Sequence, residues 1–226
     1  MTTNFPLLLE RHGAVAVICF NRPAALNAID PPMARAFLSA VRELASDLIG
    51  PLHEALTVLD AMDAPLVAQV HGVAAGAGLS LMLQADFVLA AEGTRFNLAY
   101  VNIGTSCDVG ASWALPRLVG MRRALEIAML GDSYDTAAAE RMGLINRVVP
   151  AADLEAEAMA LAQRLAKGPT AALGNLRRLM RGAFGRDLAS QLDAESAAFR
   201  TCAATDDFRI GIDAFFDRKP ATFTGR

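Results

Sequence analysis

The sequence predicts an α/β protein, a core of strands and helices followed by a helical C-terminal region. Strand-like apolar runs dominate the first half, and helical apolar periodicity dominates the second. The segment 66–87, LVAQVHGVAAGAGLSLMLQADF, joins a strand pattern to a helix pattern through a glycine-rich turn. We therefore expect a core over residues 1–150 and a helical region over residues 151–226.

Composition indicates a packed globular chain and excludes several classes of protein. The 226 residues are 54% hydrophobic with mean hydropathy +0.32, which argues against disorder. A net charge of −3 argues against a general nucleic-acid surface. We find no membrane-spanning apolar run and no signal-peptide pattern, so we expect a cytoplasmic protein without a membrane partner. The three cysteines and three histidines are scattered, which predicts reduced thiols and no metal site.

Local signals predict the elements of the first sixty residues. Segments 7–10 and 14–20 are expected to pair as a β-hairpin. Asp30, followed by two prolines, predicts the start of a helix. A second helix is expected from Pro51 and should end before Pro65.

The remaining elements follow from the same rules. The expected strands are an apolar run after Pro65, 87–90 and 144–150, with a short strand or loop at 95–100. The expected helices are 79–85, one beginning near residue 109, 121–130, 136–142 after an Asp135 cap, 153–166, 169–180, 188–199 and an amphipathic final segment.

The glycine-rich turn is the first candidate for chemistry. Gly72, Gly76 and Gly78 are separated only by small residues, at the predicted start of a helix. Free backbone N–H groups at such a place bind anions and developing oxyanions. Glycines also permit close helix packing, which is the alternative for this turn. A dinucleotide-binding fingerprint is disfavoured because the spacing differs and the acidic residue after the next strand is missing.

Five motifs, in the same order along the chain, resemble those of the crotonase (enoyl-CoA hydratase/isomerase) family. They are NRPAALNA at 21–28, HGVAAGAG at 71–78, LPRLVG at 115–120, GLINRVVP at 143–150 and the tail at 206–223. Residues 108–113 together with 75–78 are most similar to ring-enoyl-CoA isomerases of phenylacetate degradation.

The resemblance implies a crotonase-like superhelix of ββα units over residues 1–150. It implies that residues 151–226 form a helical trimerisation region that also caps the active site. The implied partner is an acyl-CoA thioester, with coenzyme A as part of the substrate and no separate cofactor. The implied assembly is a homotrimer or a dimer of trimers.

The chain departs from the family between Asp47 and Leu48. There the family has a further strand and a loop with an Ala-Gly-Gly-Asp-like motif, which supplies the first oxyanion-hole amide. Either the chain lacks this segment, or its residues are missing from the sequence. A long loop beside a ligand site favours the second explanation, because such loops are often mobile.

By resemblance, the N–H of Ala77, between Gly76 and Gly78, is the second oxyanion-hole donor. Hydratases of the family use two glutamates, and the matching positions here are Ser80 and Tyr100. Two-glutamate hydration is therefore not expected.

By resemblance, Asp108 falls where isomerase-type and dehalogenase-type members have an aspartate, and one carboxylate can move a proton between two carbons. Double-bond isomerisation is the preferred function. Water addition by Asp108, and a non-catalytic acyl-CoA-binding subunit, stay open, as does a plain helix N-cap role for Asp108.

Other residues have implied or rival roles. By resemblance, Ser80, Tyr100 and Trp113 line the acyl pocket, although the two aromatic rings could equally be core packing. A hydrolytic triad of His71, Ser80 and Asp108 is disfavoured because Ser80 lacks a nucleophile-elbow context. Asp86 is expected to be structural.

The resemblance also places coenzyme A. Four residues would lie along the adenine–pantetheine groove, namely Arg22, Ala24, Ala25 and Leu26. Phe215 and Arg218 would reach the groove from the C-terminal helix, either of the same chain or of a neighbouring subunit. Family members usually have lysine at the position of Arg218, and arginine can also pair with phosphate. A solvated tail is the alternative for Arg218.

Overall fold

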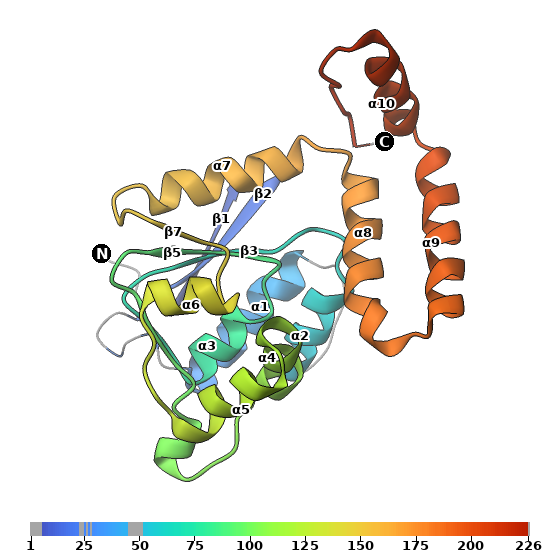
Figure 1. Ribbon diagram of the computed structural model, residues 1–226. Coiled ribbons are helices and arrows are strands. Elements are labelled where there is room, and N and C mark those ends of the chain that lie inside the picture. Colours follow the sequence, from blue (N-terminus) through green and yellow to red (C-terminus); the bar gives the residue numbers. More distant parts are fainter. Residues whose placement is uncertain (1–5, 23–24, 26, 28, 45–51, 226) are drawn as a thin grey trace. The chain divides into compact units, whose positions relative to one another are not determined.

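The computed structural model describes residues 6–22, 25, 27, 29–44 and 52–225 (Figure 1). It divides into two compact units. The first unit comprises Met1–Asp60 and Leu66–Met159, and the second comprises Ala61–Pro65 and Ala160–Arg226. The division falls inside helix α7 (Leu154–Ala166), slightly beyond the boundary expected at residue 150. Over the described residues no helix is long and apolar enough to cross a membrane.

The predicted hairpin is present at the start of the first unit. Strands β1 (Leu7–His12) and β2 (Val15–Phe20) pair in antiparallel register, with His12 opposite Val15. Gly13 lies in the turn with φ 65°, a conformation that two-residue hairpin loops require.

The predicted pair of helices follows the hairpin. Helix α1 (Pro31–Leu44) begins as expected, because Asp30 Oδ1 accepts a hydrogen bond of 2.9 Å from the Met33 N–H. Helix α2 is Leu52–Ala61. Phe37 of α1 stacks on Phe20 with ring centroids 5.5 Å apart, and Ala55 of α2 completes this cluster.

The central strands form a coil in which each turn contributes to two parallel sheets. Strands β3 (Val67–Val70), β5 (Phe87–Ala91) and β7 (Arg147–Val149) form one parallel sheet in that order. Strands β4 (Val73–Ala75) and β6 (Arg95–Asn97) form a second, and Phe96 of β6 bridges onward to Tyr134. This is the repeated β-β-helix arrangement that the sequence resemblance implies.

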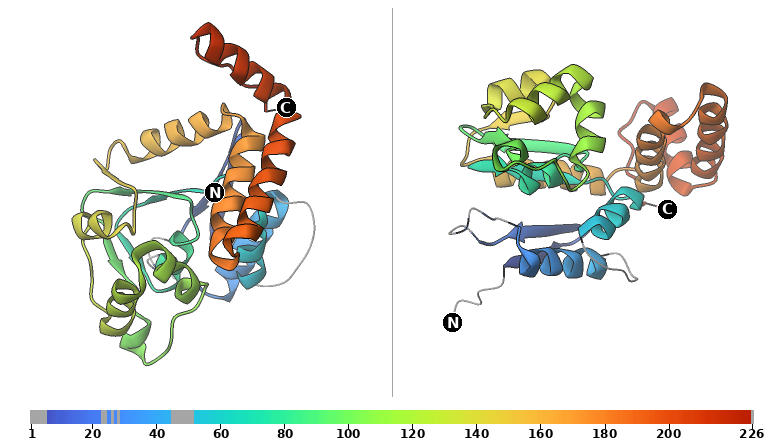
Figure 2. Two further views of the ribbon diagram at one scale, coloured as in Figure 1. Left: turned by 45° about the vertical axis from the view of Figure 1, so that its right-hand side comes forward. Right: turned by 90° about the horizontal axis from the view of Figure 1, so that it is seen from below.

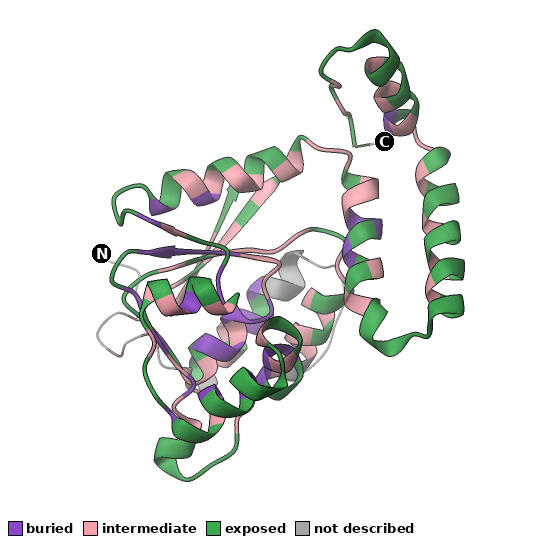
Figure 3. Ribbon diagram, in the orientation of Figure 1, coloured by how far each residue is buried: buried purple, intermediate pink, exposed green. Residues whose placement is uncertain are grey.

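Helices of the first unit cover these strands. They are α3 (Ala77–Met82), the 3₁₀ helix η2 (Tyr100–Ile103), α4 (Ala111–Val119), α5 (Met121–Leu130), α6 (Thr136–Met142) and the first part of α7. The inner faces of α3, α4, α5 and α6 form one apolar core with β5 and β6, in which Leu79, Phe96 and Ile127 are almost fully buried. Figure 3 shows this burial along β5 and α3. The core fixes α3, which carries the glycine-rich turn.

The second unit consists of helices. They are the last part of α7, α8 (Thr170–Gly182), the 3₁₀ helix η3 (Ala183–Gly185), α9 (Leu188–Ala203) and α10 (Asp206–Asp217). Helices α8 and α9 lie side by side in both Figure 1 and Figure 2. The buried Arg177 of α8 donates to the Met62 carbonyl, and Arg178 pairs with Asp63. These contacts attach segment Ala61–Pro65 to the helices. No residue of α9 is fully buried (Figure 3).

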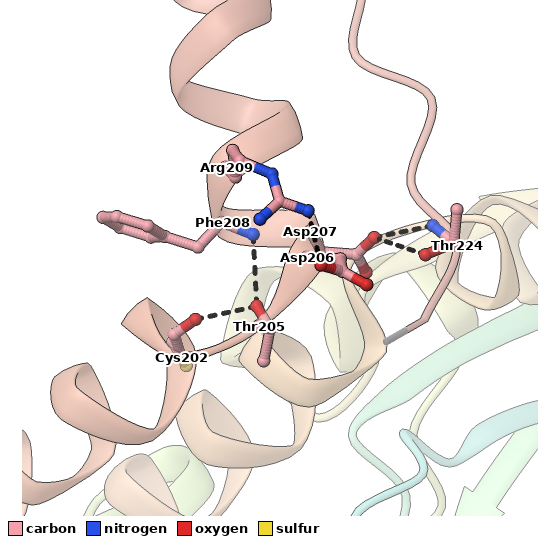
Figure 4. A network of polar contacts seen from close by, with 7 residues as sticks. All are labelled: Cys202, Thr205, Asp206, Asp207, Phe208, Arg209 and Thr224. Carbon is pink, nitrogen blue, oxygen red and sulfur yellow. Dashed lines mark hydrogen bonds and ion pairs between the residues drawn. The ribbon is translucent and has the colours of Figure 1, made fainter.

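A buried carboxylate holds the C-terminal tail against α10. Asp207 is 2% exposed, and its oxygens accept from the Thr224 N–H at 2.7 Å, the Thr224 hydroxyl at 3.1 Å and the Gly225 N–H at 2.9 Å. Thr205 caps the same helix by accepting from the Phe208 N–H at 3.1 Å (Figure 4). We call the contacts of Asp207 with Thr224 and Gly225 the tail latch.

The tail latch predicts unequal effects for two neighbouring aspartates of α10. Asp207→Asn removes the charge that the tail amides contact, so it should lower the free energy of unfolding by about 1.5–3 kcal/mol. Asp206→Asn, in the same helical turn, only breaks an exposed ion pair with Arg209 and should change it by less than about 0.5 kcal/mol. Urea denaturation measures both, and limited proteolysis should release the tail only in Asp207→Asn. Equal effects of the two substitutions would contradict the latch.

Candidate active site

The glycine-rich turn leaves one backbone amide unpaired. Gly76, with φ 52° and ψ −125°, precedes α3, and its N–H donates to the Asn97 carbonyl of β6 at 3.0 Å. Ala77 is the first residue of α3, and among the described residues its N–H has no hydrogen-bond partner. The structure therefore presents the amide that the sequence analysis assigned to an oxyanion hole. Gly78 lies inside α3 and is exposed.

The hydroxyl of Ser80 fixes the orientation of this amide. Ser80 is fully buried, and its N–H at 3.0 Å and its Oγ at 3.2 Å both donate to the Gly76 carbonyl. The bond from Gly76 to Ala77 is a trans peptide, so its C=O and N–H point in opposite directions. Because the carbonyl is held toward α3, the Ala77 N–H points away from it.

Ser80 and Tyr100 contact each other, at the positions where the resemblance places the two glutamates of hydratases. Ser80 Oγ lies 3.3 Å from the Tyr100 hydroxyl oxygen. Ser80 has one hydroxyl proton and gives it to the Gly76 carbonyl, so Tyr100 is the donor in this contact. Neither side chain can supply the carboxylate that two-glutamate water addition needs.

The alternative of a hydrolytic triad is ruled out by the same contacts. His71 is exposed between β3 and β4, not within a strand as its sequence pattern indicated. The Ser80 hydroxyl is fully buried and bonded to Gly76 and Tyr100 rather than to an imidazole. Asp86 has the expected structural contact, since its Oδ2 accepts from the Leu66 N–H at 2.7 Å.

Asp108 lies on an exposed turn before α4 and does not cap that helix. Its Oδ1 accepts from the adjacent Val109 N–H at 2.6 Å. The N-cap of α4 is Gly110, which has no side chain to accept a capping bond. The plain N-cap interpretation of Asp108 is therefore wrong, and its exposed carboxylate stands ahead of the helix.

The turn that carries Asp108 is strained. Val109 has φ 58° although it is β-branched, and it is 3% exposed. Gly110 follows with φ 72°. A non-glycine residue in this region costs about 1–3 kcal/mol and persists only where its surroundings hold it. Such strain is often found at functional sites.

Gln84 holds this turn, and the sequence analysis missed it. Its Nε2 donates to the Ser80 carbonyl at 3.3 Å and to the Val109 carbonyl at 3.4 Å. It is a buried polar residue with 9% exposure. The available signal was a long amide side chain within an otherwise apolar pattern, at 79–85.

The two predicted pocket aromatics have different surroundings. Tyr100 is half-buried and packs against the core of the first unit. Trp113 is 43% exposed, and the Arg117 guanidinium stacks on it with its carbon 4.3 Å from the ring centroid. The structure brings Tyr100 to Ser80, and Trp113 takes no part in that contact.

Four residues were expected along the adenine–pantetheine groove. Two of them lie outside the described residues, namely Ala24 and Leu26. Arg22 pairs with Asp30 at 2.5 Å, and its carbonyl accepts from the Ala25 N–H at 3.0 Å. The Met33 N–H hydrogen bond, followed by the Arg22 guanidinium, holds the pKa of Asp30 below its usual value. This contribution to stability is fully present above the ordinary aspartate pKa and is lost as the pH falls from there through the lowered pKa.

The other two expected coenzyme A contacts belong to the second unit. Phe215 is 77% exposed and meets Phe216 edge-to-face, with centroids 5.6 Å apart. Arg218 is exposed and ends α10 with φ 54°. Both side chains are therefore open to a ligand.

Comparison with known proteins bears on this arrangement. The model of the enoyl-CoA hydratase/isomerase family matches residues 45–226. A probable enoyl-CoA hydratase from Rhodobacter capsulatus is 40% identical over 162 residues, 72% of this chain and 63% of that protein. The 1,2-epoxyphenylacetyl-CoA isomerase of Escherichia coli is 37% identical over 162 residues, with 72% and 62% covered.

These alignments span less than two thirds of either curated relative, and both relatives are longer than this chain. The sequence passes directly from Asp47 to Leu48, and residues 45–51 lie outside the described residues.

The fold agrees with the family match. The crystal structure of an enoyl-CoA hydratase/isomerase from Cupriavidus metallidurans superimposes with a TM-score of 0.91 at 25% identity. The match covers 100% of this chain and 98% of that one. The parallel coil and the helical C-terminal region are thus those of the crotonase fold. Sequence and structure together show that the chain belongs to the enoyl-CoA hydratase/isomerase family.

Proposed function

We propose that the protein is an acyl-CoA enzyme that shifts a carbon–carbon double bond of an enoyl-CoA. The observation that carries the proposal is the contact between Ser80 and Tyr100, two residues that stand, by the sequence resemblance, at the positions of the two glutamates of hydratases. Asp108 then supplies an exposed carboxylate for acid–base chemistry. Proteins named as hydratases and proteins named as isomerases are both similar to this chain, so the choice of isomerisation rests on these side chains.

The reaction needs one base and one oxyanion donor that act together. The Asp108 carboxylate takes a proton from the α carbon of a 3-enoyl thioester, and the electron pair moves onto the carbonyl oxygen as an enolate. The Ala77 N–H donates to that oxygen while it carries charge. The protonated Asp108 then returns the proton to the γ carbon, so that the double bond ends between the α and β carbons.

A second amide donor would strengthen the site. Removal of one oxyanion donor typically costs about 10²–10³ in rate, so a site with Ala77 alone should turn over more slowly than one with two donors. A chain that does not contain the family's Ala-Gly-Gly-Asp-like loop would have to take a second donor from elsewhere. The direct passage from Asp47 to Leu48, without that loop, favours the rival function, a non-catalytic acyl-CoA-binding subunit.

The substrate and the assembly belong to the same proposal. An acyl-CoA thioester would extend from the Ala77 amide toward Arg22 and Ala25, with no separate cofactor. By resemblance, Phe215 and Arg218, of this chain or of a neighbouring subunit, would contact its coenzyme A part. A homotrimer or a dimer of trimers is supported by large apolar side chains that are exposed in the single chain. They include Met121, Leu125, Met129, Leu130, Leu176, Met180, Phe184, Leu188, Leu192 and Phe199.

One pair of incubations separates the three functions. An isomerase converts 3-enoyl-CoA to 2-enoyl-CoA without a change in mass, and in D₂O it incorporates deuterium at the α or γ carbon. A hydratase that uses Asp108 adds the mass of one water molecule to 2-enoyl-CoA, the reaction named for the Rhodobacter relative. A binding subunit changes the fluorescence of the single tryptophan on addition of acyl-CoA but yields no product.

Asp108→Asn should lower kcat for isomerisation by about 10²–10⁴-fold, because the amide can neither take up nor return the proton. KM should change little, since the isosteric side chain keeps the shape of the site. Initial rates of conjugated 2-enoyl-CoA formation measure both constants. The control is Asp132→Asn, an exposed aspartate outside the site, which should behave as wild type. Unchanged turnover in Asp108→Asn would refute the mechanism.

Ser80→Ala should lower kcat by about 10-fold or more, because the Gly76 carbonyl loses one of its two donors and the Ala77 amide is less firmly aimed. Tyr100→Phe leaves the Ser80-to-Gly76 bond in place, so its loss of kcat should be smaller. Steady-state kinetics of both variants, with thermal unfolding to confirm that they fold, give the comparison. A larger loss in Tyr100→Phe than in Ser80→Ala would contradict this role of Ser80.

A further inference from the structure

Gln84 connects the two parts of the candidate site. It lies in the turn after α3, and its side chain amide is buried beside the apolar core of the first unit. From there it donates both to the Ser80 carbonyl, at 3.3 Å, and to the Val109 carbonyl, at 3.4 Å. One side chain thus joins the segment that aims the Ala77 amide to the turn that carries Asp108.

The Asp108 turn requires such support. Its left-handed residues, Val109 and Gly110, are consecutive, and the Val109 N–H donates to the Asp108 carboxylate at 2.6 Å. The Val109 N–H, which contacts the Asp108 carboxylate, and the Val109 carbonyl, which accepts from Gln84, therefore belong to the same residue. If that carbonyl were released, the strained φ of Val109 could relax, and the carboxylate would move with it.

Close packing supports the contact independently of the hydrogen bonds. A Cβ at Gly110 would lie 3.0 Å from Gln84 Nε2, so the glycine backbone leaves only enough room for the amide. A buried amide that formed no hydrogen bonds would be unfavourable in this apolar setting. The turn and Gln84 therefore stabilise each other.

We propose that Gln84 is a positioning residue for Asp108. Its amide holds the Val109 carbonyl, and the 108–110 turn transmits this constraint to the carboxylate. The proposal rests on the proposed proton transfer by Asp108, because it assigns to Gln84 the task of fixing where that transfer occurs. If Gln84 only fills space in the core, a side chain of similar shape without an N–H should replace it without a loss of kcat.

Gln84→Met provides that side chain, and Gln69→Met makes the same change on the exposed face of β3 as a control. We expect Gln84→Met to lower kcat for isomerisation by about 10- to 10²-fold, with KM within about twofold of wild type. Gln69→Met should keep wild-type constants. Wild-type kcat in Gln84→Met would overturn the proposal.

A double-mutant cycle tests whether Gln84 acts through Asp108. In the Asp108→Asn background, single-turnover rates should be the same with and without the Gln84→Met substitution, because the positioned carboxylate is already gone. If Gln84→Met lowered the single-turnover rate by the same factor in the Asp108→Asn background as in wild type, Gln84 would act by another route, and the proposal would be overturned.

Hydrogen–deuterium exchange gives a readout that does not need turnover. Gln84→Met should speed exchange at the Val109 and Gly110 amides, while α5 should exchange as in wild type. Unchanged protection of the turn would overturn the proposal even if the protein proved to be a binding subunit. A wild-type protein without isomerase activity would instead overturn the proposed function, so the two failures are distinguishable.

Discussion

The geometry of the candidate site depends on the hydrogen bond from the buried Ser80 hydroxyl to the Gly76 carbonyl. This hydroxyl adds a second hydrogen bond to the Gly76 carbonyl, which already accepts the first intrahelical N–H of α3. The carbonyl therefore cannot rotate without the loss of both bonds, and the adjoining Ala77 amide is held in the opposite direction. The surrounding core, with Leu79 and Met82 on either side of Ser80, keeps water from competing for these bonds.

The core also explains how an exposed acid can be held in place. Asp108 itself is open to solvent, where a side chain on an unsupported turn would sample many positions. Its neighbour Val109 is buried, and the carbonyl of Val109 is bonded to the buried amide of Gln84. The rigidity of the turn thus comes from apolar packing next to it, while the carboxylate stays accessible to a substrate.

Sequence reasoning predicted those features that local chemistry determines. The Asp30 and Asp135 caps, the β-hairpin and the bounds of α5 and α6 follow from residues a few positions apart, and all are confirmed. The family motifs predicted the parallel coil, and the structural match confirms it. Helix α3 was expected at 79–85 but begins at Ala77, because Gly76 adopts a positive φ that lets the helix start directly after it.

The long-range features could not be read from the sequence in the same way. The bonds from Gln84 to Val109 and from Ser80 to Tyr100 join residues that meet only when successive turns of the coil stack. No local pattern marks such partners. Amino-acid propensities also could not predict the left-handed conformation of Val109, because β-branched residues rarely adopt it. The roles of the site residues remain predictions that the proposed variants address.

The tail latch has a practical consequence for handling this protein. Thr224 and Gly225 are anchored to the carboxylate of Asp207 through their backbone amides. An affinity tag or a fluorescent fusion joined there would crowd the anchored amides, and purification or imaging reagents would then alter the helix they were meant only to label. A long glycine–serine spacer, or a tag at the other terminus, would leave the anchored segment undisturbed.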